Sequence, residues 1–138
     1  MSEQTVAYGL SVTVQLPYER AVEVTREELA KEGFGVLTEI DVKATLKKKI
    51  DVDFRPYVIL GACNPPLAHQ ALSAEQEIGL LLPCNVVVYA ADEEGKTVVA
   101  AIDPVKQLEI SGNPGVGPIA EQVRTKLARV VEGVAGTA

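Results

Sequence analysis

Apolar and polar residues alternate along the first stretch of the chain, from residue 5 to residue 16. Such a period of two is typical of a strand with one buried side, and the apolar positions are Val6, Tyr8, Leu10, Val12, Val14 and Leu16. The pattern then changes to a helical one between Pro17 and Gly33, residues that suit a helix start and a helix end. We predict an inner helix face of Tyr18, Val22 and Leu29 and a wet face of Glu19, Arg20, Glu23, Arg26 and Glu27.

Three elements are predicted in the middle of the chain. Residues 34–42 have strand character, with Val36, Ile40 and Val42 expected on one face. Asp41 is a suitable N-cap for a short helix over residues 42–50, with Leu46 and Ile50 inward. Residues 57–60 form a compact apolar strand that Gly61 ends.

The second half of the chain continues this mixture of helices and strands. Asn64, followed by Pro65, predicts a new helix, and Ser73 with Gln76 forms a possible capping box where that helix breaks and restarts. Strands over residues 84–91 and 96–102 flank a hairpin turn at 92–95. Residues 105–117 are expected to be a loop, and Pro118 opens a last helix with Ile119, Val123, Leu127, Val130 and Val134 on its inner face.

Hairpin-linked strands mixed with helices predict an α+β domain over residues 1–138, with a mixed or antiparallel sheet and helices packed on one face. The other face of so apolar a sheet needs a cover. We therefore expect a homodimer, in line with the common closed symmetry of small oligomers.

Composition narrows the classes of partner. Apolar residues make up 47% of the 138 residues, and the formal net charge is −6. An acidic chain of this kind is unsuited to nucleic acid, and its apolar runs are too short to cross a membrane. We expect a cytoplasmic protein with no nucleic-acid or membrane partner and no cofactor. The basic run Lys47-Lys48-Lys49 is read as a solvated helix face.

The two cysteines, Cys63 and Cys84, are the candidates for chemistry. Cys63 precedes the proposed cap Asn64, and a helix start can lower a thiol pKa, whereas the structural interpretation is a small buried apolar residue. Cys84 opens a strand and gains interest only if it lies near Cys63. Their separation of 21 positions matches no zinc motif, and His69, the single histidine, falls nearly opposite Cys63 on a helical wheel.

Several segments carry a resemblance to a known family. They are 34–42 (FGVLTEIDV), 59–65 (ILGACNP), 79–86 (GLLLPCNV) and 101–104 (AIDP). With these segments the chain resembles the domain-of-unknown-function 302 family over residues 6 to 134. The resemblance implies a fold similar to the TATA-binding-protein-like arrangement, in a single copy that dimerises, and it implies no reaction.

Three functional hypotheses remain open. The first is a non-catalytic module that binds a small ligand or a partner protein, with Cys63, Asn64, Cys84 and Asn85 as binding candidates. The second is a thiol-active protein with Cys63 as nucleophile or sulfur acceptor and Cys84 as its resolving partner, and the third is a metal site at both cysteines. The glycine-rich segment 112–118 is read as a stiff loop, since Pro114 and Pro118 remove N–H donors that a phosphate would need.

Overall fold

The computed structural model describes residues 6–137. Within them lie five strands, five α-helices and two short 3₁₀ helices. Their bounds are β1 (Gly9–Val14), α1 (Tyr18–Lys31), β2 (Gly35–Asp41), α2 (Val42–Ile50), β3 (Tyr57–Cys63), α3 (Pro65–Ala74), η1 (Gln76–Leu81), β4 (Cys84–Ala90), β5 (Thr97–Ile102), α4 (Pro104–Leu108), η2 (Glu109–Ser111) and α5 (Gly117–Thr137).

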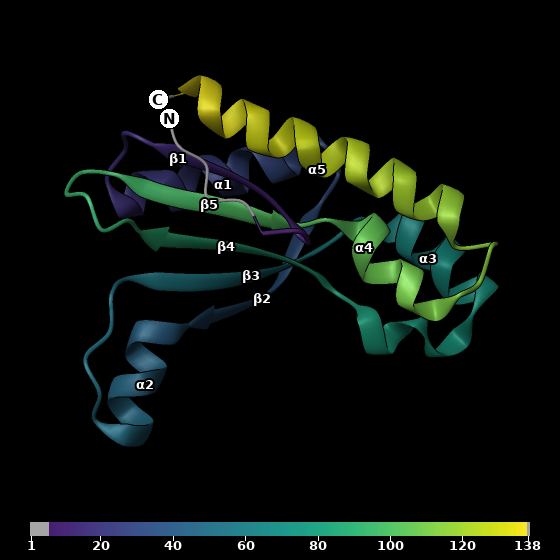
Figure 1. Ribbon diagram of the computed structural model, residues 1–138, viewed down its shortest axis with the longest axis horizontal. Coiled ribbons are helices and arrows are strands. Elements are labelled where there is room, and N and C mark those ends of the chain that lie inside the picture. Colours follow the sequence, from purple (N-terminus) through teal and green to yellow (C-terminus); the bar gives the residue numbers. More distant parts are fainter. Residues whose placement is uncertain (1–5, 138) are drawn as a thin grey trace.

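The strands form one sheet in the order β1-β5-β4-β3-β2, and every neighbouring pair is antiparallel. This confirms the predicted α+β class and selects the antiparallel form of the sheet. β1 pairs with β5 rather than with a strand close in sequence, so that Gly9 lies opposite Ile102. Figure 1 shows these two strands side by side, although most of the chain separates them in sequence.

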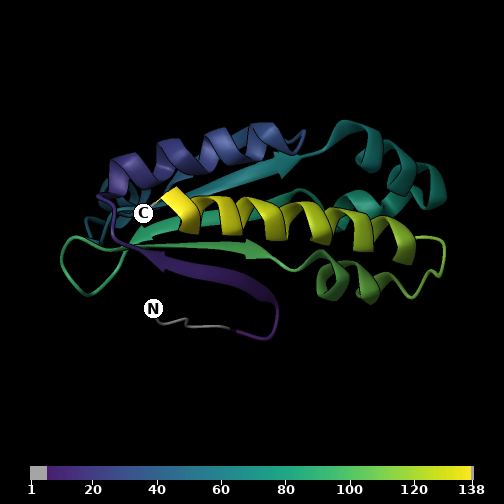
Figure 2. The same cartoon turned by 90° about the horizontal axis from the view of Figure 1, so that it is seen from above.

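Helices α1 and α5 lie side by side on one face of the sheet (Figure 2). The strands send alternate residues into this layer. The buried members in the three central strands are Val58, Leu60, Ala62, Cys84, Val86, Val88, Val99 and Ala101, and from the helices come Val24, Leu29, Leu127, Val130 and Val134. The core is therefore aliphatic and lies between the sheet and these two helices.

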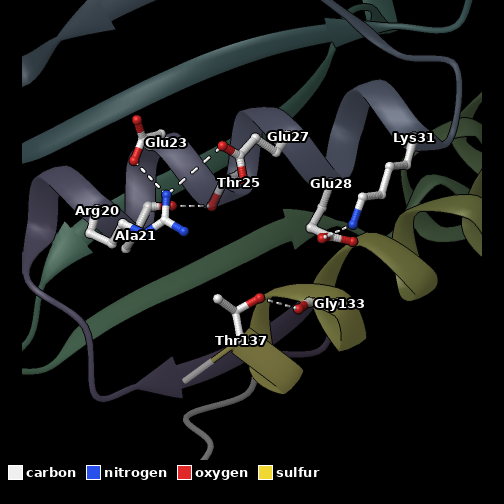
Figure 3. Close-up of polar contacts among 9 residues, drawn as sticks. All are labelled: Arg20, Ala21, Glu23, Thr25, Glu27, Glu28, Lys31, Gly133 and Thr137. Carbon is white, nitrogen blue, oxygen red and sulfur yellow. Dashed lines mark hydrogen bonds and ion pairs between the residues drawn. The ribbon is translucent and has the colours of Figure 1, made fainter.

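The charged face of α1 points into solvent, as its sequence predicts. Arg20 reaches Glu23 at 2.5 Å and Glu27 at 3.8 Å, and Lys31 reaches Glu28 at 2.8 Å (Figure 3). Exposed ion pairs of this kind contribute little stability. They keep the outer surface of the helix layer polar.

The first strand is shorter than predicted. β1 begins at Gly9, and Val6 and Tyr8 before it are exposed, because the chain turns there and the Gly9 N–H donates to the Val6 carbonyl. The Tyr8 carbonyl instead accepts from the Asp103 N–H at 2.7 Å. Thr5, also predicted in this strand, lies outside the described residues.

A β-bulge overturns the predicted face of β2. The register with β3 shifts between Val36 and Thr38, so that Val36 lies opposite Ala62 on the helix side while Ile40 lies opposite Ile59 on the other side. An extra residue in one strand reverses the alternation beyond it. The expectation that Val36 and Ile40 share a face is therefore wrong.

The helix caps predicted from sequence are confirmed at two sites. Asp41 accepts from the Ala44 N–H at 2.9 Å at the start of α2, and Asn64 accepts from the Leu67 N–H at the start of α3. The break after α3 is also present, although no side chain caps η1, so the capping box is wrong. The expectation that Ile50 faces inward is wrong as well, since α2 has no buried residue.

The segment expected to be a loop contains α4 and η2. Asp103 caps α4 by accepting from the Val105 N–H at 3.0 Å, and Pro104 occupies the first turn. Leu108 at its end is buried in the core. Asp103-Pro104 is the same kind of helix-start signal as Asn64-Pro65. The sequence pattern does not predict a helix here, because five residues are too few to show a helical pattern of apolar positions.

The second face of the sheet, here called the open face, has no helix layer over it among residues 6–137. Apolar and aromatic side chains lie there, half-buried, including Ile59, Val87 and Tyr89, and the rings of Tyr57 and Tyr89 stack with centroids 5.1 Å apart. Helix α2 projects away from the sheet beyond its β2 edge (Figure 1).

Candidate ligand-binding cavity

A cavity of about 320 Å³ opens at the end of the sheet where β3 leads into α3 and β4 begins. Its walls come from β2, β3, β4, α3, α4, α5 and the segments beside them. The lining residues are Phe34, Leu37, Thr38, Ala62, Cys63, Asn64, Leu67, Ala68, Ala71, Leu72, Leu82, Pro83, Cys84, Leu108, Ile119 and Val123. Nearly all of the exposed wall is hydrocarbon.

The α3 wall is positioned by Asn64. Its side-chain oxygen accepts from the Leu67 N–H at 3.3 Å, and its nitrogen donates to the Glu32 carbonyl, also at 3.3 Å. The first bond starts the helix, and the second ties that start to the end of α1. Leu67 and Ala71, which are buried, then face the cavity.

The opposite wall is held by α4. The Asp103 carboxylate, which caps this helix, also accepts from Arg124 Nε of α5 at 3.1 Å. Gln107 Nε2 donates to the carbonyls of Leu81 and Pro83 and so fixes the segment that carries Leu82 into the lining. The cavity is therefore bounded by tied elements on both sides.

Three residues form the mouth of the cavity. Leu37 is 67% exposed, Leu72 is 40% exposed, and Thr38 is also exposed. The Thr38 side chain lies over Gly61, its partner in β3, and a Cβ on that glycine would overlap the Thr38 Oγ1. Gly61 is thus required for this close approach.

Cys84 lies in the floor of the cavity with 6% of its surface exposed. Burial raises its pKa from 9.0 to about 11, and Cys63 adds a smaller electrostatic contribution. Its S–H donates to Gln107 Oε1 at 3.6 Å. A thiol in this state is protonated at neutral pH and is a weak nucleophile.

The two cysteines do not form a pair. Both are free, and the register puts Cys84 opposite Ala62 instead of Cys63. Because neighbouring side chains in a strand point to opposite faces, Cys63 and Cys84 leave the sheet on different sides. The predicted thiol-active pair is therefore wrong, since the resolving thiol neither faces Cys63 nor is ionised.

The remaining sequence candidates lie away from a common site. Asn85 is exposed and does not line the cavity, and His69 is exposed on α3. Among residues 6–137, no group of three or more His, Cys, Asp or Glu side chains is placed to hold a metal ion. Of the four binding candidates, Cys63, Asn64 and Cys84 line the cavity.

Comparison with known proteins places the chain in a family. The family model described as "Domain of unknown function DUF302" matches residues 10–134. The chain belongs to the DUF302 family. The crystal structure of an uncharacterised conserved DUF302 protein from Bacillus stearothermophilus is 32% identical, with a TM-score of 0.84 over 93% of this chain and 98% of that one.

Among curated proteins, none matches this DUF302 chain. In the part of the chain that the structure describes, no helix has the length and apolar character needed to cross a membrane.

Most of the cavity was not predicted from the sequence. Its wall residues are ordinary core residues by type, and they come from segments as distant as Phe34 and Val123. One signal was available on α3, where Ala68 and Ala71 share a face with Leu67 and Leu72. Small residues on an inward helix face leave space that larger ones would fill.

Proposed function

We propose that this chain is a non-catalytic module that binds an apolar small molecule in the cavity between α3, α4 and the end of the sheet. The observation that carries this proposal is an open cavity of about 320 Å³ whose walls are almost entirely hydrocarbon. An apolar cavity of roughly 150 Å³ is enough to bind benzene. The present one has the size of an ordinary small-molecule site.

The gain from filling this cavity is sufficient for measurable binding. Each buried methylene group contributes about 0.8 kcal/mol, so a ligand with eight such groups gains roughly 6 kcal/mol. The loss of translational and rotational freedom on binding offsets part of this gain, so the dissociation constant is expected to lie above about 0.05 mM. Polar contacts between the ligand and the mouth of the cavity would strengthen binding.

Binding is favoured over catalysis by the chemistry of the lining. Its residues include no Asp, Glu, Lys, Arg or His that could transfer a proton. The thiol in its floor, Cys84, has a pKa raised by burial to about 11. A ligand in this position would meet packing surfaces instead of reactive groups.

The test is a titration with N-phenyl-1-naphthylamine, an uncharged probe whose fluorescence rises in apolar surroundings. The variant Ala68→Leu fills the cavity from α3, and we expect it to weaken probe binding at least tenfold. The matched control is Ala74→Leu, at an exposed position of the same helix outside the lining. Equal binding by both variants, or none by the wild type, contradicts the proposal.

A partner protein could insert an apolar side chain into the same opening. This alternative is separated from the first by size-exclusion chromatography with light scattering on the probe-saturated protein. A small-molecule module binds the probe without a change in mass. Probe binding that appears only with a second macromolecule would favour the alternative.

We also propose that the functional form is a homodimer in which a second copy covers the open face. This is supported by the apolar side chains there, such as Ile59 and Val87, and by α2, which has no buried residue in its own chain. Helix α2 carries Lys43, Lys47, Lys48 and Lys49, opposite in sign to the net charge of −6. A second copy therefore offers both apolar cover and charge complementarity.

Light scattering on wild type and Val87→Glu tests the dimer. We expect about twice the chain mass for the wild type and one chain mass for the variant, with Gln122→Glu, at an exposed position of α5, as the control for charge. A monomeric wild type at high protein concentration contradicts the dimer.

We also propose a cytoplasmic location for this protein. This proposal is supported by its two cysteines, which are free, because thiols stay reduced in the cytoplasm.

A further inference from the structure

We propose that the ligand is an uncharged amphiphile, with an apolar body in the cavity and one neutral hydrogen-bonding group at the Thr38 hydroxyl. Alcohols, aldehydes, amides and esters with a hydrocarbon chain belong to this class. The inference rests on the proposed function, because it assigns a ligand class to the same cavity.

The buried part of the lining requires an apolar body in the ligand. Leu67, Ala71, Leu108 and Ile119 are all buried and present only carbon atoms from their side chains. A polar group placed among them would lose its water without gaining a hydrogen-bond partner, which is strongly unfavourable. The polar end of a ligand must therefore lie toward the mouth.

At the mouth, Thr38 is the polar side chain positioned to meet that end. In the part of the chain that the structure describes, its hydroxyl makes no hydrogen bond to protein. Gly61 lets this side chain lie flat against β3, since any larger residue would collide with it. Asn64 also lines the cavity, but its oxygen and nitrogen already bond to Leu67 and Glu32.

Neither a negatively nor a positively charged head group suits this cavity. The lining contains no Lys, Arg or His to pair with a carboxylate and no Asp or Glu to pair with an ammonium group. An unpaired ion that loses part of its hydration is strongly disfavoured. The net charge of −6 disfavours anions further at low ionic strength.

The experiment compares three ligands of equal chain length as competitors of N-phenyl-1-naphthylamine at pH 7: 1-octanol, octanoate and octylammonium. We expect 1-octanol to displace the probe at a concentration at least tenfold lower than either ion. In Thr38→Val the advantage of 1-octanol should fall by about 3- to 10-fold, the loss of one hydrogen bond. The probe affinity of each variant is measured separately and used to convert displacement into competitor affinity.

The control variant is Thr45→Val, which removes a threonine hydroxyl from α2, a helix that contributes no residue to the lining. It should leave all three competitors unchanged. If octanoate or octylammonium competes as well as 1-octanol, or if Thr38→Val leaves 1-octanol unchanged, the inference is wrong while the proposed function stands. If the wild type does not bind the probe, the proposed function itself fails.

Discussion

The contact between Gly61 and Thr38 gives a stability prediction that can be worked from the structure. An added Cβ at Gly61 would overlap Thr38 Oγ1 and would lie 2.9 Å from Pro83 Cγ. Overpacking of this kind costs about 1–3 kcal/mol. Alanine also restricts the unfolded chain, which stabilises by about 0.4–1 kcal/mol. We expect Gly61→Ala to destabilise the fold by about 1–2 kcal/mol.

A double-mutant cycle isolates the part of this cost that comes from Thr38. In Thr38→Ala the oxygen is gone, and the remaining Cβ lies 3.5 Å from the methyl carbon added at Gly61, an ordinary contact. Gly61→Ala should then cost at least 1 kcal/mol less than in the wild type, leaving the Pro83 contact. The measurement is urea denaturation of the four proteins, followed by circular dichroism, with a common slope.

Two results would refute this reasoning. One is a cost below about 0.3 kcal/mol for Gly61→Ala in the wild-type background, which would mean that Thr38 and Pro83 move aside freely. The other is an equal cost in both backgrounds, which would mean that the two residues are not coupled. In a control substitution, Gly35→Ala in β2, the added Cβ meets nothing within 4 Å, so only the effect on the unfolded chain remains and the fold should not be destabilised.

Other expectations concern the walls of the cavity. Burial raises the pKa of Cys84 from 9.0 to about 11, so the stabilising contribution of this thiol is complete below pH 9 and is lost as the pH rises through 11. The difference in unfolding free energy between wild type and Cys84→Ala, measured in urea, should therefore be about 2 kcal/mol smaller at pH 11 than at pH 8. Asn64→Ala removes the cap of α3 and the bond to Glu32, and should lower the free energy of unfolding by about 1–2 kcal/mol; a loss below 0.3 kcal/mol would contradict this. Asp103→Ala removes the cap of α4 and the partner of Arg124, so thermal unfolding should occur several degrees lower and probe binding should weaken; unchanged binding would mean that α4 does not shape the cavity.

Most helices and strands of this fold can be predicted from the sequence, because they depend on local signals. Asp41 and Asn64 cap helices in the structure as their positions predict, and the hairpin turn at 92–95 joins β4 to β5. Errors arise where a tertiary contact decides. The bulge between Val36 and Thr38 accompanies the approach of Thr38 to Gly61, a contact between two strands that no local pattern reveals.

The candidate site could be predicted only at its edge. The Asn-Pro signal at Asn64 marks the entry to α3, and Cys63, Asn64 and Cys84 do line the cavity. The enclosed volume depends on how residues from several elements pack, and apolar residues such as Leu108 and Val123 look the same in a filled core. The register of β3 and β4, which decides that the cysteines leave the sheet on opposite sides, is also a property of the assembled sheet.

The pairing of β1 with β5 has a consequence for the rate of folding. Gly9 meets Ile102 across most of the chain, whereas β4 and β5 are joined by a short turn. Contacts between distant residues form slowly because a long loop must close first. We expect β4 and β5 to be structured in the folding transition state and β1 to join afterwards. Val12→Ala should then act mainly on the unfolding rate, and Val88→Ala should also slow folding.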